Sequence, residues 1–144
     1  MGRAMMLDDP TAALDFALAR VGDRWSLLLV ASLLGGPRRF GELAAAVPGI
    51  APNVLADRLR RLARAGLVVA RPYERRPVRY EYALTADGME LAPVVRSLAV
   101  WGARRSGAGE GPRHAVCGTR LELRFWCPSC REVIEEGILE EVTL

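Results

Sequence analysis

The sequence contains no lysine, one histidine and three cysteines, and it has no apolar run long enough to cross a membrane. Its most apolar stretch, residues 25–34, ends at Gly35-Gly36-Pro37 after about three helical turns, whereas a membrane span needs roughly 18 apolar residues. No secretory signal is present. The cysteines all follow residue 116 and are too few and too clustered for a disulfide framework. We therefore expect a protein of the reducing cytoplasm that has no membrane partner.

All twenty basic residues are arginine, and they are unevenly distributed along the chain. Residues 1–105 carry sixteen Arg against ten acidic residues, whereas residues 106–144 carry four Arg against seven, so the two parts have net charges of +6 and −3. The first part is therefore suited to bind a polyanion. Arginine favours bidentate contacts with phosphate and guanine, although a compositional bias of the source genome explains the absence of lysine equally well.

The first 105 residues are predicted to form a mainly helical fold. Asp9-Pro10 and Asp23 are typical helix starts. The helix after Asp23 is apolar on nearly all sides, which favours a central position in the core. Two shorter helices are predicted at residues 40–47 and 52–65, separated by the turn Pro48-Gly49. Two helices joined by a tight turn, with the second helix the longer, indicate a helix-turn-helix.

A small antiparallel β-wing is predicted to follow this motif. Apolar and polar residues alternate over residues 78–84, which is typical of a half-buried strand, and residues 67–71 form its partner. The charged segment 72–77 between them is then the loop of a wing. Thr85 caps a final helix whose apolar stripe is longer than one small core can cover, so we expect this stripe to form a homodimer interface. The predicted interface residues are Leu91, Val95, Leu98 and Trp101.

The helix at residues 52–65 has a basic outer face. At 100° per residue, Leu55, Leu59 and Leu62 cluster within about 60°, which leaves the polar residues on the opposite side. Those polar residues are Asn53, Asp57, Arg60, Arg61 and Arg64. Asparagine can pair with adenine and arginine with guanine, whereas the aspartate can read cytosine or orient a neighbouring arginine. A solvated surface is the alternative, but the helix-turn-helix context favours insertion into the major groove of double-stranded DNA.

Further arginines flank this helix in the sequence. Arg38 and Arg39 lie at the predicted start of the preceding helix, where the macrodipole disfavours a cation by roughly 0.3–1 kcal/mol and a nearby phosphate would more than offset this cost. Arg75, Arg76 and Arg79 lie in the wing, residues 72–79, where they can follow the DNA backbone or enter a narrow minor groove. Ordinary hydration of a charged loop is the alternative for the wing arginines.

Three segments of the chain are distinctive as a set: VGDRWSLLLVASLLGGPRRFGELAAAVPGIAPNVLADRLRRLARAGLV, RPVRYEYALTADG and a closing WG. Together they resemble the HxlR-type regulators, a winged-helix family related to the MarR-type regulators, over residues 12–102. The resemblance implies a cytoplasmic, homodimeric repressor or activator. Its first and last helices would pair two subunits, and the helix at 52–65 would enter the major groove of a palindromic operator. An unidentified small-molecule effector is compatible with such a regulator.

The chain departs from that family pattern at two positions. Relatives often carry a cysteine just before the first helix, and in some of them it senses oxidants or electrophiles, but here the segment reads Leu7-Asp8-Asp9-Pro10. Thiol sensing at that position is therefore excluded. Relatives also tend to have Ser or Thr capping the recognition helix, whereas Ala51 precedes Pro52 here. The cap must come from elsewhere or be missing, and a missing cap costs about 1 kcal/mol.

The tail contains a predicted metal site. After a Gly-rich linker at residues 106–112, His114 and Cys117 form one pair and Cys127 and Cys130 another, each with two intervening residues, which is the spacing of a zinc ribbon. These four residues are the only histidine and all the cysteines of the chain. A structural Zn²⁺ would supply folding energy that a tail with few apolar residues lacks. Unligated thiols with a CxxC redox pair are the alternative.

These observations divide the chain into a winged helix-turn-helix and dimerisation domain (residues 1–105), a linker (106–112) and a β-rich, zinc-ribbon-like tail (113–144). In the tail, apolar and charged residues alternate over residues 121–125, which is typical of a strand, and a further short strand is predicted at 138–144. The favoured function is sequence-specific regulation of transcription. One alternative is a metal- or redox-responsive protein whose tail cysteines are the sensing or reactive site, and another is a protein interaction module with an acidic tail. The chain has no carboxylate pair, phosphate-binding glycine loop or catalytic triad, so we do not expect an enzyme.

Overall fold

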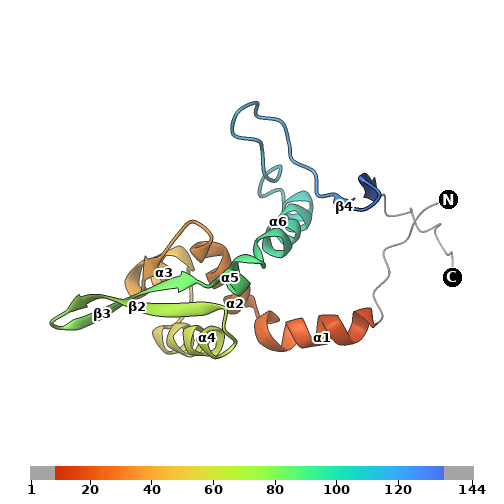
Figure 1. The fold of residues 1–144 in the computed structure, drawn as a ribbon. Helices are drawn as coiled ribbons and strands as arrows, with labels where there is room; N and C mark the ends of the chain where they lie inside the picture. Colours follow the sequence, from red (N-terminus) through yellow and green to blue (C-terminus); the bar gives the residue numbers. More distant parts are fainter. Residues whose placement is uncertain (1–8, 135–144) are drawn as a thin grey trace.

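The computed structural model describes residues 9–134, which form a helical body with a small antiparallel sheet and a separate short hairpin (Figure 1). In chain order the elements are α1 (Pro10–Val21), α2 (Arg24–Leu33), β1 (Arg38–Arg39), α3 (Phe40–Ala46), α4 (Pro52–Arg64), β2 (Val68–Arg75), β3 (Val78–Leu84), α5 (Ala86–Met89), α6 (Ala92–Ser106), β4 (Phe125–Cys127) and β5 (Glu132–Ile134). The predicted winged helix-turn-helix with a small β appendage is confirmed. The division into 1–105, 106–112 and 113–144 stays a prediction. The strand predicted over residues 121–125 is wrong for residues 121–124, since β4 begins only at Phe125, and the strand predicted at 138–144 lies outside the described residues.

Short acidic side chains start the first two helices, as the sequence predicts. The Asp9 carboxylate accepts a hydrogen bond from an amide in the first turn of α1 (2.8 Å), and Asp23 accepts from the Trp25 and Ser26 amides of α2 (3.1 and 3.0 Å). These bonds satisfy amides that have no partner within their helix. By contrast, α4 has no side-chain hydrogen bond from its N-cap residue Ala51, in agreement with the sequence.

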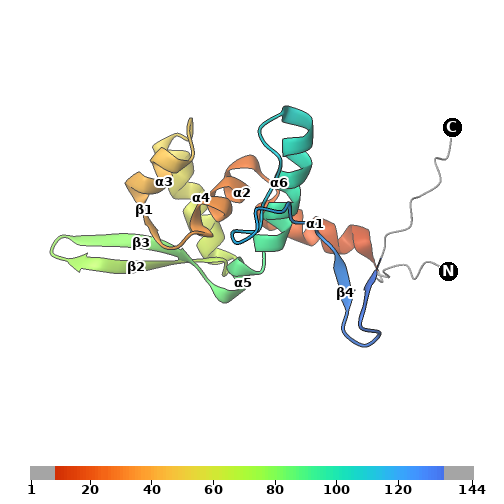
Figure 2. The ribbon, with the colours of Figure 1, turned by 90° about the horizontal axis from the view of Figure 1, so that it is seen from above.

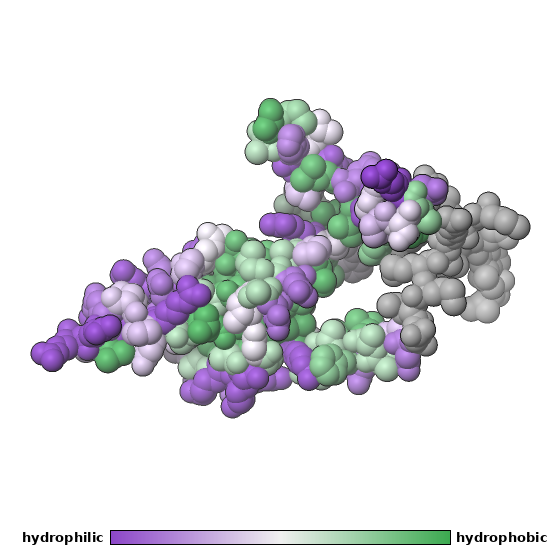
Figure 3. All heavy atoms as spheres, in the orientation of Figure 1, coloured by the Kyte–Doolittle hydropathy of each residue, from purple (hydrophilic) through white to green (hydrophobic). Residues whose placement is uncertain are grey.

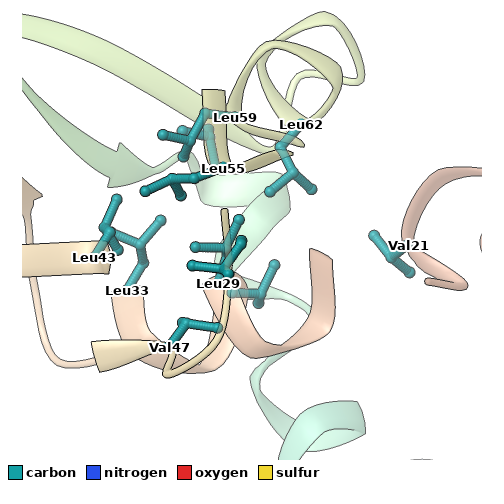
Figure 4. Packing of buried hydrophobic residues seen from close by; sticks show 11 residues of the cluster. Val21, Leu29, Leu33, Leu43, Val47, Leu55, Leu59 and Leu62 are labelled. Atoms are coloured by element: carbon teal, nitrogen blue, oxygen red, sulfur yellow. The ribbon is translucent and has the colours of Figure 1, made fainter. Parts of the chain in front are cut away.

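The core is an apolar cluster centred on α2. Leu29 is fully buried, with side chains of α3 on one side of it and side chains of α4 on another (Figure 4). The buried members are Val21, Leu29, Val30, Leu33, Leu43, Val47, Ile50, Leu55, Leu59, Leu62 and Val68. The buried residues of α4 are the three leucines of its predicted stripe, so the core determines which face of α4 points outward. In α1, Val21 alone is buried, so the rest of that helix lies outside the core.

The wing is a longer and more regular hairpin than the sequence predicts. The sheet has the order β1-β3-β2, and β2 continues to Arg75, so the loop predicted over residues 72–77 is wrong. Only Arg76 and Pro77 form the turn, because Arg75 pairs with Val78. Pro72 is tolerated within β2 because this strand is at the edge of the sheet, where a missing amide hydrogen need not break a ladder. The unpredicted strand β1 covers the other edge of β3 at its base.

The predicted half-buried face of β3 is only partly correct. Tyr82 and Leu84 pack against the core cluster, but Val78 and Tyr80 are exposed. The cause is visible in Figure 1, where the outer part of the β2–β3 hairpin extends beyond the helices. Alternation of apolar and polar residues predicts a strand correctly, but it does not predict how far the core reaches beneath that strand.

The single final helix predicted from the sequence is broken into α5 and α6. Thr85 does cap α5, since its hydroxyl accepts a hydrogen bond from the Gly88 amide (3.1 Å), but the chain then turns before α6. Pro93 explains the break, because it has no amide hydrogen and its ring clashes with the carbonyl four residues earlier in a continuous helix. At its other end, α6 stops at Gly107, which takes the left-handed conformation (φ 68°).

The wing and the outer helices lie at opposite ends of the molecule. Figures 1 and 2 show the β2–β3 hairpin extending from one end and α1 and α6 at the other, with α3 and α4 between them. Within residues 9–134, none of the helices combines the length and the apolar character that crossing a bilayer requires.

Candidate nucleic-acid interface

The outer face of α4 is polar and basic. Leu55, Leu59 and Leu62 hold the opposite face in the core. Of the three predicted arginines, Arg60 and Arg64 are exposed and Arg61 is half-buried, and Asn53 is exposed as well. None of the three guanidinium groups forms an ion pair with a carboxylate in the part of the chain that the structure describes. Their charges and N–H donors therefore remain available to an anionic partner.

Asp57 is held by the neighbouring Arg58. Arg58 Nη1 donates to Asp57 Oδ2 (2.6 Å), and Arg58 Nε donates to Asp23 Oδ1 (3.0 Å), so one guanidinium joins α4 to the capping residue of α2, 35 residues away. Of the two roles that the sequence leaves open for Asp57, orienting a neighbouring arginine is the one this arrangement favours. A role of Asp57 in reading a base remains a prediction.

Arg58 is a site residue that sequence reasoning missed. It lies about 60° from Leu55 around the helix, at the margin of the apolar stripe, where a long side chain reaches the neighbouring helix and not solvent. The available signal was the combination of this marginal position with an acidic N-cap on α2, but the sequence does not specify which helix end faces which arginine. Arg58 therefore positions α4 and is not itself on its outer face.

The Asp23 carboxylate is shared by the α2 cap and the bridge to α4. Burial raises its pKa, but hydrogen bonds from the Ser26 hydroxyl (2.5 Å) and amide, together with Arg58, outweigh burial and lower the pKa below its ordinary value. Ser26 is fully buried, so Asp23 also provides the partner that its hydroxyl needs. The ionised carboxylate thus holds the start of α2 and, through Arg58, the middle of α4.

The two arginines before α3 have different surroundings. Arg38 Nε donates to the Ser32 carbonyl (2.7 Å) in the last turn of α2, where helix carbonyls lack partners and the macrodipole favours a cation. Arg38 therefore has an intramolecular contact that the sequence does not predict. Arg39 is exposed, and its guanidinium lies over the Tyr73 ring, 4.2 Å from the ring centre. This contact connects the start of α3 to β2 of the wing.

The wing carries its arginines at and near its tip. Arg75 and Arg76 are exposed and have no ion pair with any residue between 9 and 134. Arg79 Nε lies 3.4 Å from Glu74 Oε2, a contact between two exposed groups that contributes little to stability. Figure 3 shows hydrophilic surface at the wing tip and along α4, the two elements that carry all of the predicted DNA-contacting residues except Arg38 and Arg39.

The outer helices carry exposed apolar side chains. On α1 these are Leu14, Phe16 and Leu18 (58%, 61% and 51% exposed), and on α6 they are Val94, Leu98 and Trp101 (53%, 50% and 56%). The predicted interface stripe is divided, because Leu91 and Val95 pack against the core of their own chain whereas Leu98 and Trp101 do not. In Figure 3 the surface over α1 is largely apolar.

The predicted metal ligands lie in two turns of the tail. His114 Nδ1 is 3.2 Å from Cys117 Sγ, while Cys127 ends β4 and Cys130 lies in the turn to β5. None of these cysteines is in a disulfide. Within residues 9–134, no three His, Cys, Asp or Glu side chains are grouped closely enough to hold a metal ion, so the two pairs are not brought together.

The Cys117 thiol is exposed and has a low pKa. The Thr119 hydroxyl, 3.3 Å from Sγ, is the largest cause, followed by the Thr119 amide and His114, and together they lower the pKa of Cys117 to about 7. A large fraction of this thiol is therefore ionised at neutral pH, and the thiolate is the form that binds metals and reacts with oxidants.

Comparisons with known proteins agree with this geometry. The model of the HxlR-like helix-turn-helix family matches residues 20–109, a range that ends before His114. An uncharacterized HTH-type transcriptional regulator of Mycobacterium tuberculosis is 40% identical over 122 residues, which are 82% of this chain and 77% of the relative. A solved protein of Enterococcus faecalis V583, assigned to the MarR family of transcriptional regulators, is 35% identical with a TM-score of 0.61, and covers 74% of this chain and 96% of its own. The redox regulator HypR in its reduced form is 30% identical with a TM-score of 0.62, and covers 67% and 95%.

Proposed function

Because the chain belongs to the HxlR-like helix-turn-helix family of transcriptional regulators, we propose that it acts as a homodimer that binds a palindromic operator in duplex DNA. In this proposal α4 enters the major groove, and the wing contacts the adjacent backbone or the minor groove. The two copies of α4 lie about 34 Å apart, so that each reads one half-site.

The observation that carries the proposal is the outer face of α4. Its three arginines have no carboxylate partner in the described part of the chain, although the chain is rich in acidic residues. Arg58, one turn from Arg61 on the same helix, is paired twice, so pairing is available where the fold uses it. Unpaired guanidinium groups in the C-terminal half of α4 are suited to phosphate and guanine.

The apolar surfaces of α1 and α6 support the dimer. A twelve-residue helix is marginal alone in water, and α1 buries only Val21 in its own chain. Its exposed leucines and Phe16, with Leu98 and Trp101 of α6, form apolar surface that a second copy of the chain would cover. These helices lie at the end of the molecule opposite the wing, so pairing through them leaves the α4 surface open to DNA (Figure 2).

Redox sensing through the tail is a second candidate function. It is favoured by the exposed Cys117 with its pKa of about 7, and by the similarity to HypR, which is described as a redox regulator. This chain has no cysteine before residue 117, so a sensor would have to act from outside the segment that the family model matches. If so, mild oxidation should change operator affinity in the wild type and not in Cys117→Ser.

Selection from a pool of random duplexes tests the DNA-binding proposal. Full-length protein should enrich one inverted repeat whose half-site centres are separated by about one helical turn, 10–10.5 base pairs. Arg60→Ala combined with Arg64→Ala should abolish enrichment, whereas Arg96→Ala, which removes an arginine from α6, should not. Enrichment of no sequence, with equal binding of all duplexes, would contradict sequence-specific regulation.

Sedimentation at micromolar concentration tests the dimer. Trp101→Asp places a charge on the exposed apolar surface of α6 and should yield monomers that no longer bind the selected duplex tightly. Val78→Asp is a suitable control for the sedimentation result alone, because this residue is about as exposed but lies on the wing hairpin, away from α6. A wild-type monomer at this concentration would contradict the proposed dimer.

A further inference from the structure

The two tail turns that carry the predicted ligands have the same backbone geometry. In the first, the Gly118 amide donates to the His114 carbonyl, and in the second, the Arg131 amide donates to the Cys127 carbonyl, both at 2.8 Å. Each turn also ends in the left-handed conformation, at φ 71° for Gly118 and 57° for Arg131. Arg131 is the one non-glycine residue with positive φ in the described range. Since this conformation costs an ordinary residue about 1 kcal/mol or more, the match is not what random loops would give.

Each turn closes a short antiparallel ladder. Arg113 and Arg120 form a bridge around the first turn, and Cys127 pairs with Glu132 around the second. A turn with one ligand at its first position and another three residues later, followed by a left-handed residue, presents two side chains on the same side. The distance within the first pair agrees, because His114 Nδ1 and Cys117 Sγ are 3.2 Å apart. On tetrahedral zinc, bonds of about 2.0 Å to nitrogen and 2.3 Å to sulfur would put these atoms about 3.5 Å apart.

The described part of the tail has no core of its own. No residue from 107 to 134 is buried. Most of its large apolar side chains, among them Leu121, Leu123, Phe125 and Trp126, are exposed, and Ile134 is half-buried. Without buried side chains, residues 107–134 lack the apolar burial that stabilises a fold, and a metal, a disulfide or a partner can supply that stability. Since none of its cysteines is in a disulfide, a metal is the cross-link for which its residues are suited.

We propose that the two turns close on one zinc ion within a single chain, with His114, Cys117, Cys127 and Cys130 as its ligands. Residues 121–124 between the turns have no regular secondary structure, so closing the turns need not break a helix or strand. One imidazole and three thiolates form a donor set that binds zinc in preference to calcium or magnesium. Four protein ligands leave no open coordination position, so the metal stabilises the tail and does not perform catalysis.

Metal content is the direct test. Full-length protein purified without added metal or chelator should contain one zinc per chain, and its three thiols should react slowly with a thiol reagent until the zinc is removed. Replacement with Co²⁺ should give the absorption of a tetrahedral, thiolate-rich site. Protein without zinc that does not bind added Zn²⁺, or a Cys127–Cys130 disulfide found by mass spectrometry under the same conditions, would overturn the proposal.

Variants in each turn test that both contribute. Cys117→Ser and Cys127→Ser should each reduce zinc from one equivalent to none, whereas Ser129→Ala, a neutral change inside the second turn, should retain it. His114→Cys should also retain zinc, since thiolate replaces imidazole, while His114→Ala should weaken binding. Full zinc content in Cys117→Ser would show that the first turn is not a ligand pair. The unfolding of the winged helix in all of these variants should match that of the wild type, which excludes general misfolding.

Co-expression distinguishes a site within one chain from a site shared between two. A mixed dimer of Cys117→Ser and Cys127→Ser chains contains one intact turn of each kind, but on different chains. A site within one chain predicts no zinc in this dimer. One zinc per mixed dimer would instead assign the metal to an interface between chains and overturn the proposal in its present form. The metal analyses of the wild type and of the single variants require neither DNA nor a dimer, so their outcome is independent of the proposed function, whereas the mixed-dimer experiment rests on the proposed homodimer.

Discussion

Replacing Asp23 should destabilise the fold by more than the loss of a helix cap alone. Its carboxylate accepts hydrogen bonds from the Trp25 and Ser26 amides, the Ser26 hydroxyl and Arg58. Asp23→Ala removes all of these bonds at once. Asp23→Asn retains an oxygen that can cap the helix and accept from Ser26, but it removes the charge that faces Arg58. The two variants therefore separate the cap from the ion pair.

The magnitudes follow from these contacts. Loss of an N-cap costs roughly 0.5–2 kcal/mol. A buried hydroxyl left without a partner adds about 1–3 kcal/mol, and the Ser26 side chain is fully buried. The ion pair is partly solvated, with side chains of Arg58 and Asp23 that are 22% and 27% exposed, so it contributes about 1 kcal/mol or less. We expect Asp23→Ala to lose about 2–4 kcal/mol of unfolding free energy, and Asp23→Asn and Arg58→Met to lose about 1 kcal/mol each.

The contribution of the Asp23 charge should depend on pH. Its pKa is lower in the folded protein than in the unfolded chain, so folding favours the ionised form. The resulting stability is present in full above the unfolded pKa of about 4 and is lost as the pH falls through the lower folded value. The stability difference between the wild type and Asp23→Asn should therefore be constant from pH 7 to pH 5 and should shrink below pH 4.

Urea denaturation at one fixed protein concentration provides the assay, because a dimer's stability depends on concentration. Asp15→Ala on the exposed face of α1 serves as the control for removing an aspartate. In the double-mutant cycle of Asp23→Asn and Arg58→Met, the losses should be less than additive, because both remove the same contact. Strict additivity, or an Asp23→Ala variant no less stable than Asp23→Asn, would refute the reasoning.

Three further predictions follow from packing and surface charge. Gly88→Ala should destabilise the protein by about 1–3 kcal/mol in thermal or urea unfolding, because its Cβ would lie 2.1 Å from the Leu67 carbonyl oxygen. Gly41→Ala is the control: nothing lies within 4 Å of the added Cβ, so it should be neutral or stabilising by up to about 1 kcal/mol. Equal losses of stability at both sites would contradict this packing. Leu29→Ala should cost about 2–5 kcal/mol, whereas Leu28→Ala on the exposed side of the same helix should cost much less, and the reverse order would place the core on the wrong face of α2. Arg39→Ala should weaken binding to random duplex DNA and reduce its salt slope by about 0.9 if it contacts one phosphate, while Arg96→Ala should change neither.

Local signals in the sequence predicted much of the fold. Asp9 and Asp23 cap the helices that they were expected to cap, because a carboxylate and the amides it accepts from are within three residues of each other. The stripe of Leu55, Leu59 and Leu62 predicted the buried face of α4, since the helical period determines which side chains share a face. These features depend on neighbours in the sequence and need no knowledge of the rest of the molecule.

The features that could not be predicted depend on contacts between distant segments. Arg58 reaches Asp23 across 35 residues, and β1 forms only because residues 81 and 82 of β3 pass beside Arg38 and Arg39. The position of Pro72 at a sheet edge, which makes it harmless, follows from strand order and not from composition. Contacts between distant segments also explain why Leu91 and Val95 of the predicted interface stripe pack against the core while Leu98 and Trp101 are exposed, since this difference depends on where α2 and the core end.

The central claim is that α4 reads DNA sequence while the arginines around it set affinity, and one titration tests it most directly. Two triple variants are titrated against the selected operator and against random duplex at two salt concentrations. In the first variant Asn53, Asp57 and Arg61 are changed to Ala, and in the second Arg39, Arg75 and Arg76 are changed to Ala. The first variant should lose operator affinity by roughly 1–3 kcal/mol for each base contact removed and bind random DNA almost as the wild type does. The second should lose affinity for both duplexes and show a flatter salt dependence. Operator selectivity that survives in the first variant would contradict the assignment of α4 to base readout.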